Sequence, residues 1–206
     1  MTKIYPNAAS SSSSPSPLSS SDDCKIGGDD PVVLTVWKKS LLLNCEGFTV
    51  FDPRGNLVYR VDNYMAAAKG HIFLMDASGA TLLTIRRKKL SLGDTWLIFD
   101  GETAENPRYT VRKNVSLLNS RCLAHVFQKK SVPIYLIEGS YARRCCSVYD
   151  EKRRRVAEIK QKEASVTGVA FGKDVFRLEV QPGFDAAVAM GMVILLDQMY
   201  GSGRFI

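Results

Sequence analysis

The chain has 206 residues, of which 45% are hydrophobic and 24% are charged, and it carries a formal net charge of +7. This is the composition of an ordinary globular domain, so it excludes a wholly disordered chain and a polytopic membrane protein. The charge is uneven, because residues 1–30 carry a net charge of −2 and the remaining residues a net charge of +9. The expected folded part is therefore more basic than the whole chain, which favours acidic partners.

Residues 1–30 are predicted to form a disordered, serine-rich tail. Positions 10–21 hold nine serines, two prolines and one leucine, which is too little apolar surface to offset the entropy of ordering the chain. The pairs Ser14-Pro15 and Ser16-Pro17 suit proline-directed phosphorylation, although we favour a plain solvated leader. The tail also lacks the arginines and the amphipathic period of a transit peptide.

The cysteines and the start of the chain indicate an intracellular, reduced protein. The first residues lack the apolar core of a secretory signal. The cysteines are odd in number and show no Cys-x-x-Cys spacing: they are Cys24, Cys45, Cys122, Cys145 and Cys146. We therefore expect reduced thiols in a cytoplasmic protein, with attachment at the membrane periphery or a nuclear location as alternatives.

From Pro31 onward the chain alternates short apolar runs with turn residues, and residues 31–206 are expected to form one domain. Phe176, Leu178 and Val180 alternate with polar residues, which is the period-two pattern of a half-buried strand. Twelve strands are predicted: 32–38, 47–52, 56–62, 71–76, 80–87, 94–100, 108–113, 122–128, 133–138, 144–150, 154–161 and 174–180.

A recurring hairpin unit predicts that these strands form an antiparallel meander. Residues 50–59 and 74–83 each place an aspartate, Asp52 or Asp76, three positions before a glycine. The aspartate opens such a turn through its side chain, and the glycine supplies a positive φ angle. Residues 148–156 are a looser copy of the unit that lacks the glycine.

One segment, after residues 181–183, is predicted to be a helix. Asp185 is the expected N-cap and Gly201 the expected C-cap, and residues 186–196 contain no polar side chain. A helix that is apolar on all sides must be enclosed by protein or by lipid. This run spans only about 16 Å, whereas crossing a bilayer takes about 20 apolar residues. We therefore predict an all-β-dominated fold, a closed antiparallel barrel of about twelve strands around this hydrophobic C-terminal helix.

Several stretches resemble the plant LURP-one-related family across residues 31–206. They are Gly47–Asp52, Gly55–Tyr64, His71–Gly79, Leu83–Leu90 and Gln181–Ala187. The resemblance implies a fold similar to the tubby C-terminal domain and the phospholipid scramblases, which is a twelve-stranded barrel around a hydrophobic C-terminal helix. It also implies a non-enzymatic, membrane-tethered regulator with a role in plant defence, in which the founding member acts.

No catalytic signature stands out in the sequence. The chain has no G-x-S-x-G, P-loop, H-E-x-x-H or dinucleotide fingerprint, so we expect a non-enzymatic protein without a cofactor. His71 and His125 lie in apolar strand contexts, which are typical of structural histidines. Cys122 and His125 are close in sequence, but a structural zinc site needs about four ligands. Adjacent strand residues face opposite sides, so at least one of Cys145 and Cys146 is expected in the core.

Clusters of basic residues are the clearest functional signal. A solvated turn explains any single cluster, but several clusters on a domain of net charge +9 favour an anionic partner. Successive strand residues point to opposite faces, so residues 86–89 can form one patch only where the sheet has ended. The candidate lipid-binding residues are Arg86, Arg87, Lys88, Lys89, Arg143, Arg144, Lys152, Arg153, Arg154 and Arg155.

Anionic membrane phospholipid, or a phosphoinositide, is the partner that this pattern favours. Few aromatic residues accompany the basic runs, which makes nucleic acid a weaker candidate. The alternative is a protein-interaction or transcription-linked scaffold with regulatory protein partners, in which the basic runs act in nuclear import. Lipid scrambling would require membrane insertion of residues 186–196, which their length argues against. We expect a monomer without a transmembrane segment.

Overall fold

A computed structural model describes residues 30–39, 41, 47–62, 70–91, 93–103, 105–115, 121–129, 131–162 and 172–201. The tail predicted for residues 1–30 lies outside the described residues except for Asp30, and so do Cys24 and Cys45.

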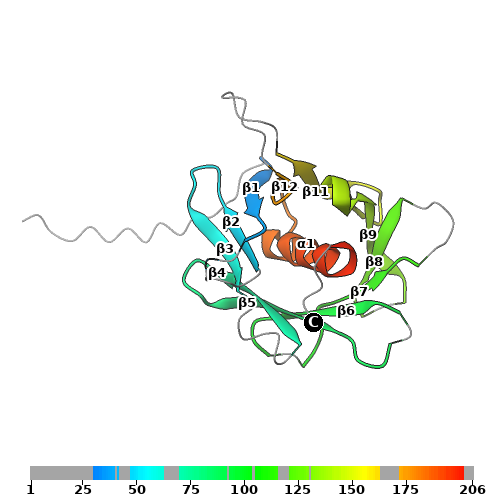
Figure 1. Cartoon of the computed structure of the whole chain (residues 1–206). Coiled ribbons are helices and arrows are strands. Elements are labelled where there is room, and N and C mark those ends of the chain that lie inside the picture. Colours follow the sequence, from blue (N-terminus) through cyan, green and yellow to red (C-terminus); the bar gives the residue numbers. More distant parts are fainter. Residues whose placement is uncertain are drawn as a thin grey trace, which may run out of the picture.

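In the described part of the chain, twelve antiparallel strands close into a barrel, and a single α-helix runs through its centre (Figure 1). Each strand pairs with its neighbours in sequence, and β1 closes the ring against β12. The elements are β1 (Val32–Trp37), β2 (Gly47–Phe51), β3 (Leu57–Asp62), β4 (His71–Asp76), β5 (Thr81–Arg87), β6 (Thr95–Asp100), β7 (Tyr109–Lys113), β8 (Cys122–Phe127), β9 (Pro133–Ser140), the 3₁₀ turn η1 (Tyr141–Arg143), β10 (Cys145–Asp150), β11 (Arg155–Gln161), β12 (Val175–Val180) and α1 (Ala186–Tyr200). The predicted barrel, its twelve strands and its central helix are confirmed, and only η1 was not anticipated.

The alternation of side chains decides which face of each strand packs on the helix. In β12, Phe176, Leu178 and Val180 are buried, whereas Arg177 is exposed. The adjacent cysteines of β10 behave in the same way, because Cys145 is exposed and Cys146 is buried. One face of every strand therefore contributes to a single core that also contains α1.

Aspartate side chains shape the three hairpin turns that the sequence pattern singled out. In the first turn, Oδ1 of Asp52 accepts hydrogen bonds from the backbone N–H groups of Arg54 and Asn56, and Gly55 has a φ angle of +86°. The second turn repeats this arrangement at Asp76 and Gly79. In the third turn the glycine position is occupied by Arg153, with a φ angle of 61°. The looser copy therefore keeps the geometry without the glycine.

These turns predict a defined loss of stability in acid. Hydrogen bonds from Asn56 lower the pKa of Asp52, and hydrogen bonds from the Ser78 hydroxyl and the Ala80 N–H lower the pKa of Asp76. The unfolded chain then takes up these protons at a higher pH than the folded chain does. The stabilisation is therefore present above pH 4 and lost as the pH falls through the folded-state values.

We expect the double variant Asp52→Asn/Asp76→Asn to flatten this dependence, because asparagine keeps the side-chain acceptor but does not titrate. Urea unfolding measured between pH 2 and pH 7 should show a shallower decline for the variant than for the wild type. An equal slope in both proteins would mean that other carboxylates dominate the acid unfolding.

The helix α1 is capped and enclosed as predicted. Asp185 accepts hydrogen bonds from the N–H groups of Ala187 and Val188, and every residue from Val188 to Met199 is buried. Gly201 caps the other end but has a φ angle of −69°, so a left-handed conformation is not the reason for glycine here. A Cβ atom at Gly201 would lie 2.4 Å from the carbonyl oxygen of Asp197, so glycine is required by close approach.

Candidate functional site

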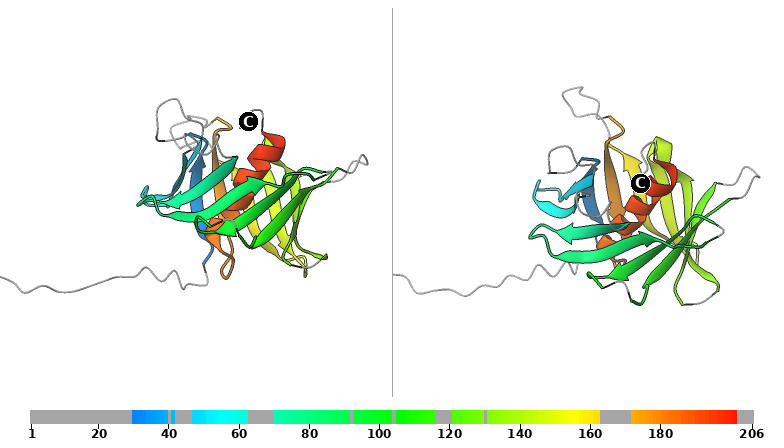
Figure 2. Two further views of the ribbon diagram at one scale, coloured as in Figure 1. Left: turned by 90° about the horizontal axis from the view of Figure 1, so that it is seen from below. Right: turned by 60° about the horizontal axis from the view of Figure 1, so that its bottom comes forward.

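The antiparallel meander gives the barrel two ends with different charge. Odd-numbered strands run toward the end at which α1 finishes, and even-numbered strands run away from it (Figure 2). We call the end at which α1 finishes the basic end. Its described residues include twelve cations and four carboxylates, whereas the opposite end has seven cations and nine carboxylates.

The twelve described cations of the basic end come from five of the connections between strands and from the strand ends beside them. The cations are Lys38, Lys39, Arg86, Arg87, Lys88, Lys89, Lys113, Arg121, Arg143, Arg144, Lys162 and Lys173, and the carboxylates are Asp62, Asp94, Asp174 and Asp197. Seven of the cations are exposed, against one carboxylate, Asp174. This end therefore presents a positive surface, which can attract a charged partner over a Debye length of about 10 Å.

The structure divides the ten candidate residues of the sequence analysis between the two ends. Residues 86–89, 143 and 144 lie at the basic end, where β5 and β9 finish. Residues 152–155 lie in the turn between β10 and β11, at the opposite end. The two groups therefore cannot form one continuous patch.

Residues 86–89 lie at the end of β5, where the sheet stops, so their side chains can form one patch. Arg86 still belongs to β5 and lies over the ring of Phe99, with its Cζ atom 4.6 Å from the ring centroid. Arg87 is exposed and pairs with Asp94 at 3.1 Å. Lys88 and Lys89 follow the strand and are exposed, and neither makes an ion pair with a described residue. These two lysines are the most available charges of the group.

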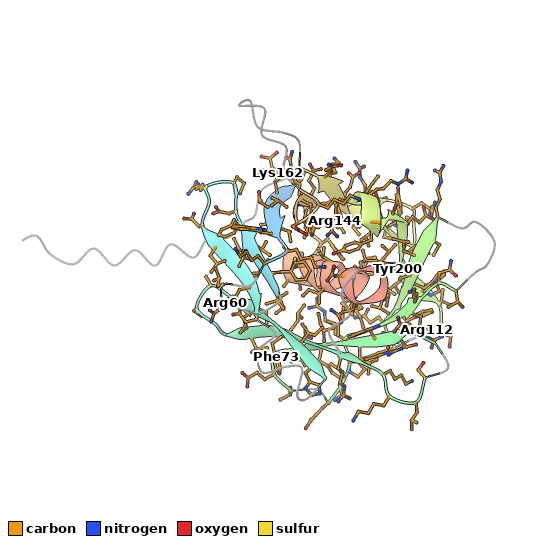
Figure 3. All side chains as sticks on the ribbon, viewed as in Figure 1. Arg60, Phe73, Arg112, Arg144, Lys162 and Tyr200 are labelled. Carbon is orange, nitrogen blue, oxygen red and sulfur yellow. The ribbon has the colours of Figure 1, made fainter. Side chains whose placement is uncertain are left out.

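Arg143 and Arg144 differ, although they are adjacent. Arg143 is exposed, whereas Arg144 is only 6% exposed. Figure 3 labels Arg144 above α1 in this view. The guanidinium of Arg144 lies 4.2 Å from the ring centroid of Tyr141, and its Nε donates a hydrogen bond to the carbonyl oxygen of Lys173. A side chain held in this way cannot reach a membrane surface. Burial and these contacts give Arg144 a structural role, and the exposed cations around it are the better candidates for an anionic ligand.

Carboxylates neutralise three of the four candidate residues at the opposite end. Arg153 pairs with Glu138 at 2.9 Å, Arg154 pairs with Asp150 at 2.7 Å, and Arg155 pairs with Glu158 at 2.7 Å. Only Lys152 makes no ion pair with a described residue. Most of this basic run is thus engaged in local ion pairs, so it is a weaker candidate for binding an anionic ligand than the lysines of the basic end that make no ion pair with a described residue.

Sequence reasoning missed several cations of the basic end because they occur singly or as one pair, spread over separate connections. Lys39, Arg121 and Lys173 are exposed there, and they belong to three separate connections of the barrel. An available signal would have been the order of the strands, because in a meander every second connection falls at the same end.

Two further cations of this end hold the helix in place. Nζ of Lys38 lies 2.9 Å from Oδ1 of Asp197, a residue with no exposed surface, and the Tyr141 hydroxyl donates to the same oxygen at 3.0 Å. Lys113 donates a hydrogen bond of 2.6 Å to the carbonyl oxygen of Met199. Cations at a helix C-terminus also stabilise the helix dipole. Burial raises the pKa of Tyr141, and Asp197 raises it further, so the hydroxyl stays a donor.

The groups with catalytic or metal-binding potential occupy structural positions. The ring of His71 meets Phe73 edge-on, and His125 lies within 3.9 Å of the Cys122 sulfur. Within the described ranges, no three His, Cys, Asp or Glu side chains come together as a metal site would need. Burial raises the pKa of the Cys146 thiol to about 12, so this thiol is not a nucleophile at neutral pH.

The fold and the charge distribution together define a closed β-barrel, built around an apolar helix, whose main surface feature is electrostatic. Residues 32–197 match the model of the LURP-one-related family. The chain therefore belongs to the LURP-one-related family, as the resemblance indicated. No described helix has the length and apolar character that a membrane span requires.

Proteins similar to this chain are found in Arabidopsis thaliana. Protein LURP-one-related 8 is 58% identical over 174 residues, which cover 83% of this chain and 88% of the relative. Protein LURP-one-related 17 is 46% identical over 184 residues, which cover 81% of this chain and 82% of the relative. An X-ray structure of an Arabidopsis thaliana protein aligns with a TM-score of 0.62 at 24% identity, over 82% of this chain and 91% of that one. The last likeness shows the fold alone.

Proposed function

We propose that this protein is a non-enzymatic binding module that docks on anionic phospholipid membranes through the basic end of its barrel. The observation that carries the proposal is the excess of exposed cations there, seven against one exposed carboxylate among the described residues. Each Lys or Arg close to an anionic membrane surface contributes about 1 kcal/mol to binding. A cluster of this size is therefore sufficient for reversible docking, including on a phosphoinositide.

The wider roles that the family resemblance implies belong to the same proposal. A membrane-tethered regulator in plant defence, related to tubby-like proteins and phospholipid scramblases, would use the barrel as its lipid-binding platform. Because α1 is buried inside the barrel, this platform acts from the membrane surface without inserting the helix.

Vesicle flotation with two matched quadruple variants tests the proposal. The first variant replaces Lys88, Lys89, Arg143 and Lys173 of the basic end with alanine. The second replaces residues 152–155, and so removes the same number of charges from the opposite end. We expect the first variant to lose up to about a thousandfold in affinity for vesicles that contain phosphatidylserine or phosphoinositide at low salt. We expect the second to stay within about threefold of the wild type.

The pattern of losses separates the possible explanations. Equal losses in both variants would mean that binding follows net charge without a defined site. A larger loss in the second variant would place the site at the opposite end. The absence of wild-type binding at low salt would contradict lipid docking and favour the alternative, a protein-interaction or transcription-linked scaffold with no lipid ligand.

A further inference from the structure

Exposed large hydrophobic side chains collect at the basic end. Among the described residues the exposed ones are Trp37, Leu41, Leu90, Val115 and Val132. The first four lie in or next to connections of the basic end, and only Val132 lies at the opposite end. Single exposed apolar residues are ordinary on protein surfaces, but their gathering among exposed cations points to an amphipathic partner.

Leu90 is unfavourable in two ways in the isolated protein. It follows Lys88 and Lys89 in the connection between β5 and β6, and its side chain is completely exposed, with a relative accessibility of 107%. Its φ angle is +57°, a left-handed conformation that disfavours residues other than glycine, asparagine and aspartate. The turn thus projects an apolar side chain beyond two lysines, and no described residue covers that side chain.

Trp37 is the second apolar side chain of this surface with a cation beside it. It is the last residue of β1, its side chain is 42% exposed, and Nζ of Lys39 lies 5.4 Å from its ring centroid. Tryptophan and lysine together suit the boundary between lipid headgroups and hydrocarbon, where a ring is partly buried and an ammonium reaches phosphate.

We propose that Leu90 and Trp37 insert into the headgroup and upper acyl layer of an anionic bilayer when the basic end docks on it. Lys88, Lys89 and Lys39 then lie at the level of the phosphates. This inference rests on the proposed function and adds to it a hydrophobic contribution and an orientation, in which the basic end faces the membrane. The apolar contact is not screened by salt, so part of the binding should survive at high ionic strength.

The two tryptophans of the chain make the insertion measurable. Trp37 is exposed, whereas Trp96 is 8% exposed. We expect vesicles of phosphatidylcholine and phosphatidylserine to shift the wild-type emission to the blue. We also expect bromine atoms on the upper acyl chains to quench it. The variant Trp37→Phe, which reports Trp96 alone, should show neither effect.

A pair of serine variants tests the contribution of Leu90. We expect Leu90→Ser to lower binding to the same vesicles at 0.5 M salt by about tenfold or more, because an inserted leucine side chain is lost. Val132→Ser makes the same kind of change at the opposite end and should bind like the wild type.

The outcomes separate this inference from the proposed function. Vesicle binding without bromine quenching, together with wild-type binding by Leu90→Ser, would overturn insertion and leave electrostatic docking in place. Failure of the wild type to bind at low salt would overturn both proposals.

Discussion

Replacing Lys38 with methionine is expected to lower the free energy of unfolding by about 3 kcal/mol. Lys38 forms its ion pair with Asp197, which is completely buried on the last turns of α1. The variant removes the cation and leaves the carboxylate in the core with only the Tyr141 hydroxyl on the same oxygen. Breaking a buried pair by removing one partner costs about 3–5 kcal/mol. We expect the lower part of that range because the Lys38 side chain retains 20% exposure.

The adjacent lysine and a double variant serve as controls for this prediction. Lys39→Met removes the same charge one residue later, from an exposed side chain over Trp37, and should change stability by less than about 0.5 kcal/mol. Lys38→Met/Asp197→Leu removes both members of the pair and should recover much of the loss, because an apolar pair has no unpaired charge. Urea unfolding followed by circular dichroism measures all three. Equal stability of Lys38→Met and Lys39→Met would show that the buried Asp197 carboxylate does not need the Lys38 cation for the stability of the fold.

Local sequence patterns predicted the fold closely because each one reflects an interaction within a single strand, turn or helix. Period-two alternation, the aspartate turns and the apolar run after Asp185 each determine one element, and a meander needs little further information. The apolar helix predicted a closed barrel because all of its faces must be enclosed and it is too short to cross a bilayer. The left-handed φ angle of Arg153, 61°, could not be predicted, because a sequence marks such a position only where it places a glycine there.

The candidate site was only partly predictable, because the sequence gives the order of the charged residues but not which of them are exposed on the same surface. Lys88 and Lys89 were identified as a run and do lie exposed. Arg144 stood in a similar run but is buried beside Tyr141, and Arg154 is paired with Asp150. Burial and pairing depend on strand register and on which turn carboxylates lie nearby. The grouping of isolated cations at one end became evident only with the order of the strands.

The largest effect of a single methyl group is expected at Gly139. This residue of β9 pairs with Cys146 of β10 and has a φ angle of +122°. A Cβ atom there would lie 2.2 Å from the carbonyl oxygen of Cys145 and 2.9 Å from Cα of Cys146. Both atoms belong to the backbone of the neighbouring strand, so they cannot move without breaking the ladder that keeps the barrel closed. We expect Gly139→Ala to cost more than about 4 kcal/mol, a loss that only severe packing or backbone defects produce.

Gly55→Ala separates the two causes of that loss. Gly55 also has a positive φ angle, +86°, but a Cβ atom there would meet nothing within 4 Å. Its substitution should cost only the conformational penalty, about 1–2 kcal/mol. The difference between the two variants, measured by thermal unfolding and by the yield of folded protein, then reports the close approach of β9 to β10. Similar losses at both positions would mean that the ladder yields at Gly139. Closure of the barrel would then tolerate a wider spacing between these strands.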